Sequence, residues 1–140
     1  MSVYLDASVL VSLFVRDAHS EQADRSLRAA RQLLIVSDFA AAEFASGVSQ
    51  HVRTQAVAAK DAITMFSEFD EWMTREASGV PMTNADVANA ATFLRRLDSP
   101  LRTPDALHIA IAQRIGARLL TFDKAMASVA RALGIEIIKA

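Results

Sequence analysis

Hydrophobic positions along the chain fall into short continuous runs separated by longer segments with a helical pattern. Four runs of four or five residues, rich in Val, Ile or Leu, are typical of buried parallel strands: 2–5, 33–36, 118–122 and 135–138. A weaker fifth candidate is 80–82, where Pro81 indicates a strand start or a sheet edge.

The segments between these runs favour helix, with windows rich in alanine. Helices are predicted over 8–15, 20–31, 38–51, 55–76, 84–97, 104–115 and 123–132. Thr103 is expected to cap a helix that begins at Pro104, and Gly116 and Gly134 stand where helix C-terminal glycines belong. Strands that alternate with helices predict a mainly parallel sheet covered on both faces.

The composition supports one packed α/β domain over residues 1–140, because 52% of the residues are hydrophobic and 22% are charged. The absence of cysteine excludes disulfides, thiolate metal sites and a cysteine nucleophile. A net charge of -1 excludes a broad basic coat for duplex DNA. No basic residue precedes Arg16, Asp6 interrupts the first apolar run, and no uncharged stretch is long enough for a membrane span, so we expect a soluble cytoplasmic protein.

Two acidic residues directly follow predicted strands. Asp6 ends the run Val3-Tyr4-Leu5, and Asp123 ends Leu120-Thr121-Phe122. Because the carboxyl ends of parallel strands meet at one edge of a sheet, both side chains are expected at the same edge, where ligands bind in such folds. Either residue, taken alone, is also explained as a helix N-cap.

Two further acids lie in predicted helices that are otherwise nearly apolar. Glu43 stands in Phe39-Ala40-Ala41-Ala42-Glu43-Phe44, where a buried carboxylate needs a partner, although a polar stripe on one helix face would also explain it. Asp105 opens the helix that is apolar on almost every side, and its first-turn position is also favoured by the helix dipole.

The combination of the four acids is more informative than any one of them. Four carboxylates near one sheet edge would repel one another unless a cation neutralised them. Oxygen ligands without cysteine or paired histidines favour a hard ion, Mg²⁺ or Mn²⁺. Such an ion, keeping several waters, suits hydrolysis of a phosphodiester.

These segments resemble, in order and spacing, the PIN-domain ribonucleases, and among them the VapC-type toxins of bacterial toxin–antitoxin pairs. The resemblance spans essentially the whole chain. The stretch Asp105-Ala106-Leu107-His108-Ile109-Ala110, followed about fifteen residues later by Thr121-Phe122-Asp123, carries most of its specificity.

The resemblance implies a three-layer α/β/α sandwich with a mainly parallel sheet of about five strands. It implies that Asp6, Glu43, Asp105 and Asp123 are the catalytic, metal-binding acids. Ser8 and Thr121 match positions that line the family's site, and Arg102 matches a basic residue that contacts phosphate or pairs with a carboxylate. For His108, one turn after Asp105, a structural role is the favoured interpretation.

The resemblance further implies an Mg²⁺- or Mn²⁺-dependent endoribonuclease that hydrolyses RNA by metal-activated water, with Glu43 or a neighbour orienting that water. It also implies a homodimer and a small cognate antitoxin. A group of arginines beside Asp105 could guide single-stranded RNA or simply be solvated helix surface: Arg95, Arg96, Arg102, Arg114 and Arg118.

Two other classes stay open from the residues alone. The chain could be a catalytically silent PIN-like module that binds RNA or protein. It could also be another magnesium-dependent α/β phosphohydrolase or a phospho-acceptor domain, although Ser8 stands where a dehalogenase-type phosphatase has a second aspartate.

Overall fold

A parallel four-stranded sheet forms the centre of the computed structural model, which describes residues 1–30 and 32–138. The strands are β1 (Ser2–Leu5), β2 (Leu33–Ser37), β3 (Ala77–Val80) and β4 (Arg118–Leu120), in the order β3-β2-β1-β4. Tyr4 is in register with Ile35 of β2 on one side and with Leu119 of β4 on the other. The expected mainly parallel α/β sheet is confirmed.

Seven α-helices and one π-helical turn surround the sheet within the described residues. They are α1 (Ala7–Val11), the π-helical turn η1 (Ser12–Arg16), α2 (Ser20–Ala30), α3 (Asp38–Arg53), α4 (Ala59–Glu76), α5 (Asn84–Arg95), α6 (Thr103–Ile115) and α7 (Lys124–Ala132). The predicted helix 8–15 is therefore divided between α1 and η1, and residue 31 of the predicted helix 20–31 lies outside the described residues.

The alternation of side chains along β1 separates two hydrophobic cores. Val3 and Leu5 point into a core shared with α1 to α4, whereas Tyr4 points into a core shared with α5, α6 and α7. Leu119 and Leu120 of β4 divide in the same way. Helices thus cover both faces, and the three-layer α/β/α arrangement expected from the sequence is present.

The predicted strand 118–122 ends two residues early, at Leu120, and two other strand predictions need larger corrections. The strand predicted over 80–82 lies earlier, at Ala77–Val80, because Pro81 has no N–H to continue the ladder, while Ala77-Ser78-Gly79 carries little strand signal. The predicted strand 135–138 forms only one parallel bridge, between Leu119 and Ile137. The sheet therefore has four strands, where about five were expected.

Helix ends follow local chemistry. Gly116 ends α6 in the left-handed conformation (φ 66°), as the sequence predicts. The N-cap of α6 is Arg102 rather than Thr103, so the helix begins one residue early, and the Asp105 carboxylate accepts the Arg102 backbone N–H at 2.9 Å.

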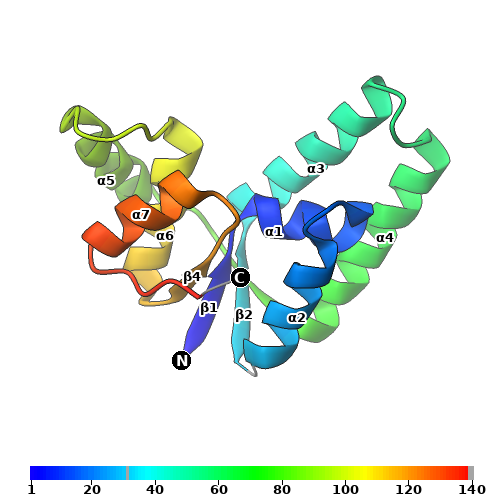
Figure 1. Cartoon of the computed structure of the whole chain (residues 1–140), viewed down its shortest axis with the longest axis horizontal. Helices are drawn as coiled ribbons and strands as arrows, with labels where there is room; N and C mark the ends of the chain where they lie inside the picture. The colour runs from blue at the N-terminus through cyan, green and yellow to red at the C-terminus, as the bar shows by residue number, and fades with distance from the viewer. Residues whose placement is uncertain (31, 139–140) are drawn as a thin grey trace.

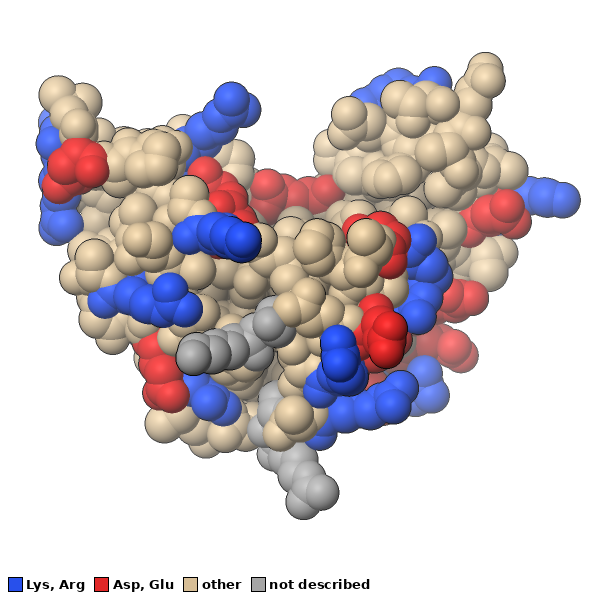
Figure 2. All heavy atoms as spheres, in the orientation of Figure 1, with Lys and Arg blue, Asp and Glu red and all other residues tan. Residues whose placement is uncertain are grey.

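The helices form two groups on either side of the carboxyl ends of the strands (Figure 1), and the molecular surface is hollowed between them (Figure 2). Helices α3 and α4 project on one side, and α5, α6 and α7 lie on the other. Within the residues that the structure describes, no helix is long and apolar enough to cross a membrane. The layout places the segment after β1, the segment after β4 and the N-terminal end of α6 around the same hollow.

Candidate active site

Asp6 lies at the carboxyl end of β1 and is almost completely buried, with 2% of its surface exposed. Its Oδ1 accepts the Ser8 hydroxyl at 2.6 Å and the Val9 backbone N–H at 3.2 Å, so Asp6 is also the N-cap of α1. Its Oδ2 accepts the hydroxyl of Thr121. All three donors are neutral groups.

The environment of Asp6 opposes its negative charge. Burial raises the pKa of Asp6, and the hydrogen bonds from Ser8 and Thr121 offset this only in part. No lysine or arginine of the described residues forms an ion pair with Asp6. A buried carboxylate in this state is stabilised by any cation that reaches it.

Two hydroxyl groups connect the segment after β1 with the segment after β4. Thr121 donates to Asp6 and accepts the Asp123 backbone N–H at 3.0 Å, and Ser8 accepts the Phe122 backbone N–H at 3.2 Å. Asp123 is the N-cap of α7, its Oδ1 accepting the Met126 N–H at 3.0 Å. The structure thus brings together Asp6, Ser8, Thr121 and the backbone of Asp123, and both aspartates are helix caps as well.

Glu43 extends from α3 to α6, where its Oε1 contacts Nε2 of the buried His108. On the other side of the ring, Nδ1 lies 2.6 Å from the hydroxyl oxygen of Tyr4, which lies 2.8 Å from Oγ of Ser37. Glu43, with 29% of its side chain exposed, thus has the polar partner that a carboxylate in this nearly apolar stretch needs. For His108 the sequence favoured a structural role. The contact between His108 and Glu43 makes the histidine part of the candidate site.

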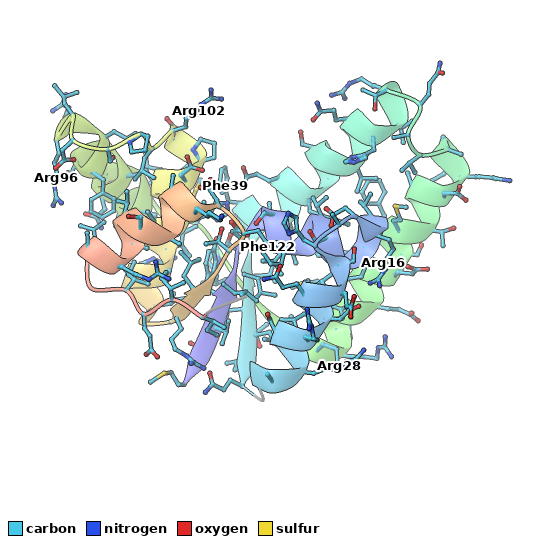
Figure 3. The ribbon with its side chains drawn as sticks, in the orientation of Figure 1. Arg16, Arg28, Phe39, Arg96, Arg102 and Phe122 are labelled. Carbon is cyan, nitrogen blue, oxygen red and sulfur yellow. The ribbon has the colours of Figure 1, made fainter. Side chains whose placement is uncertain are left out.

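Asp105 and Arg102 occupy the N-terminal end of α6 beside the hollow. Among the described residues, the Asp105 carboxylate accepts one hydrogen bond, which the Arg102 backbone N–H donates to its Oδ2. Arg102 is exposed, and Figure 3 shows it at the end of α6, with Phe39 and Phe122 at the inner end of the hollow. In Figure 2, acidic atoms line the floor of this hollow, and basic side chains lie on both of its flanks.

The acids do not form a ready metal site in the arrangement that the structure shows. Among residues 1–30 and 32–138, no three His, Asp or Glu side chains are grouped closely enough to hold an ion. Each of the four carboxylates instead accepts a hydrogen bond from a donor of the protein: Asp6, Glu43, Asp105 and Asp123. The donor set is nevertheless all oxygen, and the unpaired charge of Asp6 fits a hard divalent cation.

A cavity of about 450 Å³ opens beside Asp123. The rings of His19 and Phe122 stack on its wall, with centroids 4.9 Å apart and planes at 19°. Lys124 and Arg131, both on α7, also line it. Aromatic faces beside cations are the combination that single-stranded nucleic acids recognise.

Sequence reasoning missed several polar side chains that the fold brings together. Tyr4 was considered only as part of a strand, and Ser37 lay between a predicted strand and a predicted helix. No local spacing links them to His108, 104 and 71 positions away in sequence. Arg114, considered as one of a group guiding RNA, forms an ion pair with the fully buried Asp86. Its role in this structure is to neutralise that carboxylate.

The protein is thus an α/β protein with an acidic site at the carboxyl ends of its parallel strands. The family model of the PIN domain matches residues 3–132, and the chain belongs to this family. Family membership sets aside the phosphatase and phospho-acceptor alternatives. The predicted PIN-domain resemblance is confirmed.

Relatives place the chain more narrowly within the family. It is 33% identical over 127 residues to ribonuclease VapC3 of Pyrobaculum aerophilum, covering 91% of this chain and 93% of that protein. Its fold is similar to that of Mycobacterium tuberculosis VapC20, a toxin that cleaves the sarcin–ricin loop, with a TM-score of 0.73, 18% identity and 99% of both chains covered. It is also similar to a chain of a toxin–antitoxin complex from Klebsiella pneumoniae (TM-score 0.67, 17% identity, 91% and 92% covered).

Proposed function

We propose that residues 1–140 form one nuclease domain, a divalent-metal-dependent endoribonuclease that is the toxin of a type II toxin–antitoxin pair. The observation that carries this proposal is the buried Asp6 carboxylate, which has neutral donors, no cationic partner in the described chain and Thr121 and Asp123 beside it. The similarity to ribonuclease VapC3 supports RNA as the substrate.

The residues that would hold the ion are Asp6, Glu43, Asp105 and Asp123, with Mg²⁺ or Mn²⁺ as the ion. All four supply carboxylate oxygens, which these hard cations prefer. Bound there, the ion supplies Lewis-acid chemistry that polarises the phosphodiester and makes water a better nucleophile.

The remaining polar groups position the Asp6 carboxylate, the attacking water and the RNA. Ser8 and Thr121 fix both oxygens of Asp6 by hydrogen bonds, and so hold that carboxylate in one orientation. Glu43, whose Oε2 has no protein donor among the described residues, accepts a hydrogen bond from the attacking water and orients it. Arg102, exposed at the rim, contacts a backbone phosphate of the RNA.

The cavity beside Asp123 binds a nucleotide next to the cleaved bond. A base stacks on the aromatic surface formed by His19 and Phe122, while Lys124 and Arg131 contact phosphates. This local basic group, rather than a broad basic coat, suits a single-stranded or looped RNA.

The partner is a small antitoxin protein that blocks the site, as the similarity to a chain of a toxin–antitoxin complex suggests. Family resemblance also supports a homodimer and a cytoplasmic location, where the RNA is found. Expression of the chain alone should arrest growth. Co-expression with a small protein encoded directly beside its gene tests the partner: the two proteins should co-purify, and growth should be restored.

Cleavage of structured RNA by the purified chain tests the activity. Mn²⁺ should support cleavage, EDTA should stop it, and Asp6→Asn should lack it while the surface change Asp61→Asn retains it. Intact RNA on a varied substrate panel, together with no calorimetric Mn²⁺ binding, would favour the silent binding module instead.

A further inference from the structure

Four side chains from four elements, β2, β1, α6 and α3, form a continuous chain of polar contacts between the sheet and the helices α6 and α3. It runs from Ser37 to Tyr4 (2.8 Å), from Tyr4 to Nδ1 of His108 (2.6 Å), and from Nε2 of His108 to Glu43. Ser37, Tyr4 and His108 are all buried. A buried polar chain of this length is costly unless every donor finds an acceptor.

The direction of each hydrogen bond follows from the two ends. The Glu43 carboxylate can only accept, so Nε2 of His108 carries the hydrogen. In the neutral ring Nδ1 is then an acceptor, and the Tyr4 hydroxyl donates to it. Ser37 donates to Tyr4 and accepts the Ala40 backbone N–H at 2.9 Å, which satisfies every donor of the chain.

The opposite direction leaves a donor without a partner. If Nδ1 carried a hydrogen, Tyr4 would accept from His108 and donate to Ser37. The Ser37 hydroxyl, already accepting from Tyr4 and Ala40, would then have no acceptor among the described residues. The contacts therefore select the neutral tautomer with hydrogen on Nε2.

We propose that Tyr4 and His108 are positioning residues that hold Glu43 in place for metal binding and water orientation. Glu43 lies on α3 with 29% of its side chain exposed, and it has three rotatable bonds to order. His108 lies on α6 one turn after Asp105, so the contact sets Glu43 relative to the helix that carries another acid of the site.

The packing around the His108 ring supports this role. Phe39 lies against the ring with centroids 5.2 Å apart, and the ring of Tyr4 lies 5.7 Å away. The ring is thus held by two aromatic neighbours and by hydrogen bonds at both nitrogens. Groups that orient a metal ligand in this way typically change metal affinity about 10- to 100-fold when removed.

The inference rests on the proposed function. The Mn²⁺ affinity of the protein and the tautomer of His108 test it independently of catalysis. Tyr4→Phe removes one hydroxyl and keeps the ring; His108→Gln keeps a donor toward Glu43, whereas His108→Leu removes it. His51→Gln is the matched control, because His51 also lies on α3 but bonds the Gly47 carbonyl, outside this chain.

We expect Mn²⁺ affinity, measured by calorimetry on folded protein, to fall about tenfold in Tyr4→Phe and further in His108→Leu. His108→Gln should retain more affinity than His108→Leu. For RNA cleavage, kcat should fall in the Tyr4 and His108 variants while KM stays within twofold. His51→Gln should match the wild type in all of these measurements.

Nitrogen-15 NMR of the metal-free protein provides a readout independent of activity. The wild type should show His108 with hydrogen on Nε2 and His51 with hydrogen on Nδ1, since the Gly47 carbonyl accepts from Nδ1 of His51. Tyr4→Phe should leave the hydrogen of His108 on Nε2, where Glu43 accepts it, but should shift the Nδ1 resonance because Nδ1 loses its hydrogen bond, and it should leave His51 unchanged.

The failure of this inference and the failure of the proposed function give different results. Wild-type Mn²⁺ binding and cleavage with unchanged affinity and kcat in Tyr4→Phe and His108→Leu would overturn the positioning role alone. An Nδ1–H tautomer of His108 would also overturn it. A wild type that binds no Mn²⁺ would overturn the proposed function, and this inference with it.

Discussion

Two buried aspartates of this protein are held in opposite ways. Asp86, at the start of α5, is fully buried and accepts two hydrogen bonds from Arg114, from Nε at 2.8 Å and Nη2 at 2.9 Å. Although burial favours the protonated form, the bonds from Arg114 and Thr83 keep the pKa of Asp86 below its ordinary value. Asp6 is nearly as buried, but neutral donors surround it, and its pKa is raised.

In the proposed function, this difference separates the structural carboxylate of Asp86 from the functional carboxylate of Asp6. At Asp86 the chain supplies the cation, so the carboxylate joins α5 to α6 and has no need of a ligand. At Asp6 the chain supplies hydrogen bonds that orient the carboxylate, but it supplies no cation that neutralises the charge. In the proposed function, an ion from solution completes this site and stabilises the folded protein.

The largest effect is expected on catalysis. Asp6→Asn should lower the rate of RNA cleavage at least about 10³-fold, equivalent to about 4 kcal/mol, because it removes charge from the proposed metal site. Cleavage of labelled RNA in Mn²⁺ measures the loss. A variant with more than about one tenth of the wild-type rate would contradict the assignment of Asp6.

At Asp86 the largest effect is expected on folding. Arg114→Met removes the cation of a buried carboxylate and should lower the free energy of unfolding by about 2–3 kcal/mol, less than for a fully buried pair because Arg114 is partly exposed. Urea denaturation measures this change. Arg95→Met, an exposed arginine on α5, should change stability by less than about 0.5 kcal/mol.

If Arg114 instead guides RNA, its substitution would leave stability unchanged and raise KM. Such a result would show that the Asp86 carboxylate does not need Arg114 for stability, and the two aspartates would then not differ in the way described.

A smaller effect of opposite sign is expected for the stability of Asp6→Asn. Because folding raises the pKa of Asp6, the metal-free wild type loses stability as pH rises from the ordinary aspartate pKa through the raised value. In EDTA the variant should therefore be more stable than the wild type at pH 8, and the gain should shrink toward pH 4.

Thermal denaturation of both proteins between pH 4 and pH 8 measures this trend, and other carboxylates cancel in the difference. A variant that is less stable than the wild type at pH 8 in EDTA would show that Asp6 contributes to folding as Asp86 does.

The smallest effect is expected at the cavity beside Asp123. Phe122→Ala removes one stacking ring and should raise KM for RNA about fivefold with little change in kcat. Steady-state kinetics measures both constants. Phe66→Ala, in an aromatic cluster between α3 and α4, is the control for loss of a ring away from this cavity and should leave KM unchanged.

Much of the fold was predictable because its signals are local. The runs that became β1, β2 and β4 are continuous and apolar, and Gly116 is the residue that a left-handed helix end favours. β3 was misplaced because Ala77-Ser78-Gly79 has no strand preference of its own, and pairing with β2 decides its structure.

The candidate site was predictable only in part. Asp6 and Asp123 follow strands, so the topology placed them at one edge of the sheet. The link from Glu43 to His108 spans 65 positions, and the ion pair of Asp86 with Arg114 spans 28, so neither has a local pattern. Which arginine is structural is decided by tertiary contacts that spacing does not encode.

The most direct test of the account is the structure of the protein soaked with Mn²⁺, with the ion located by its anomalous scattering. We expect an ion bound to the Asp6 carboxylate and to at least two of Glu43, Asp105 and Asp123, after small side-chain movements. An ion-free Asp6 in crystals that bind Mn²⁺ elsewhere, or Glu43 and Asp105 remaining apart from any shared ion, would contradict it.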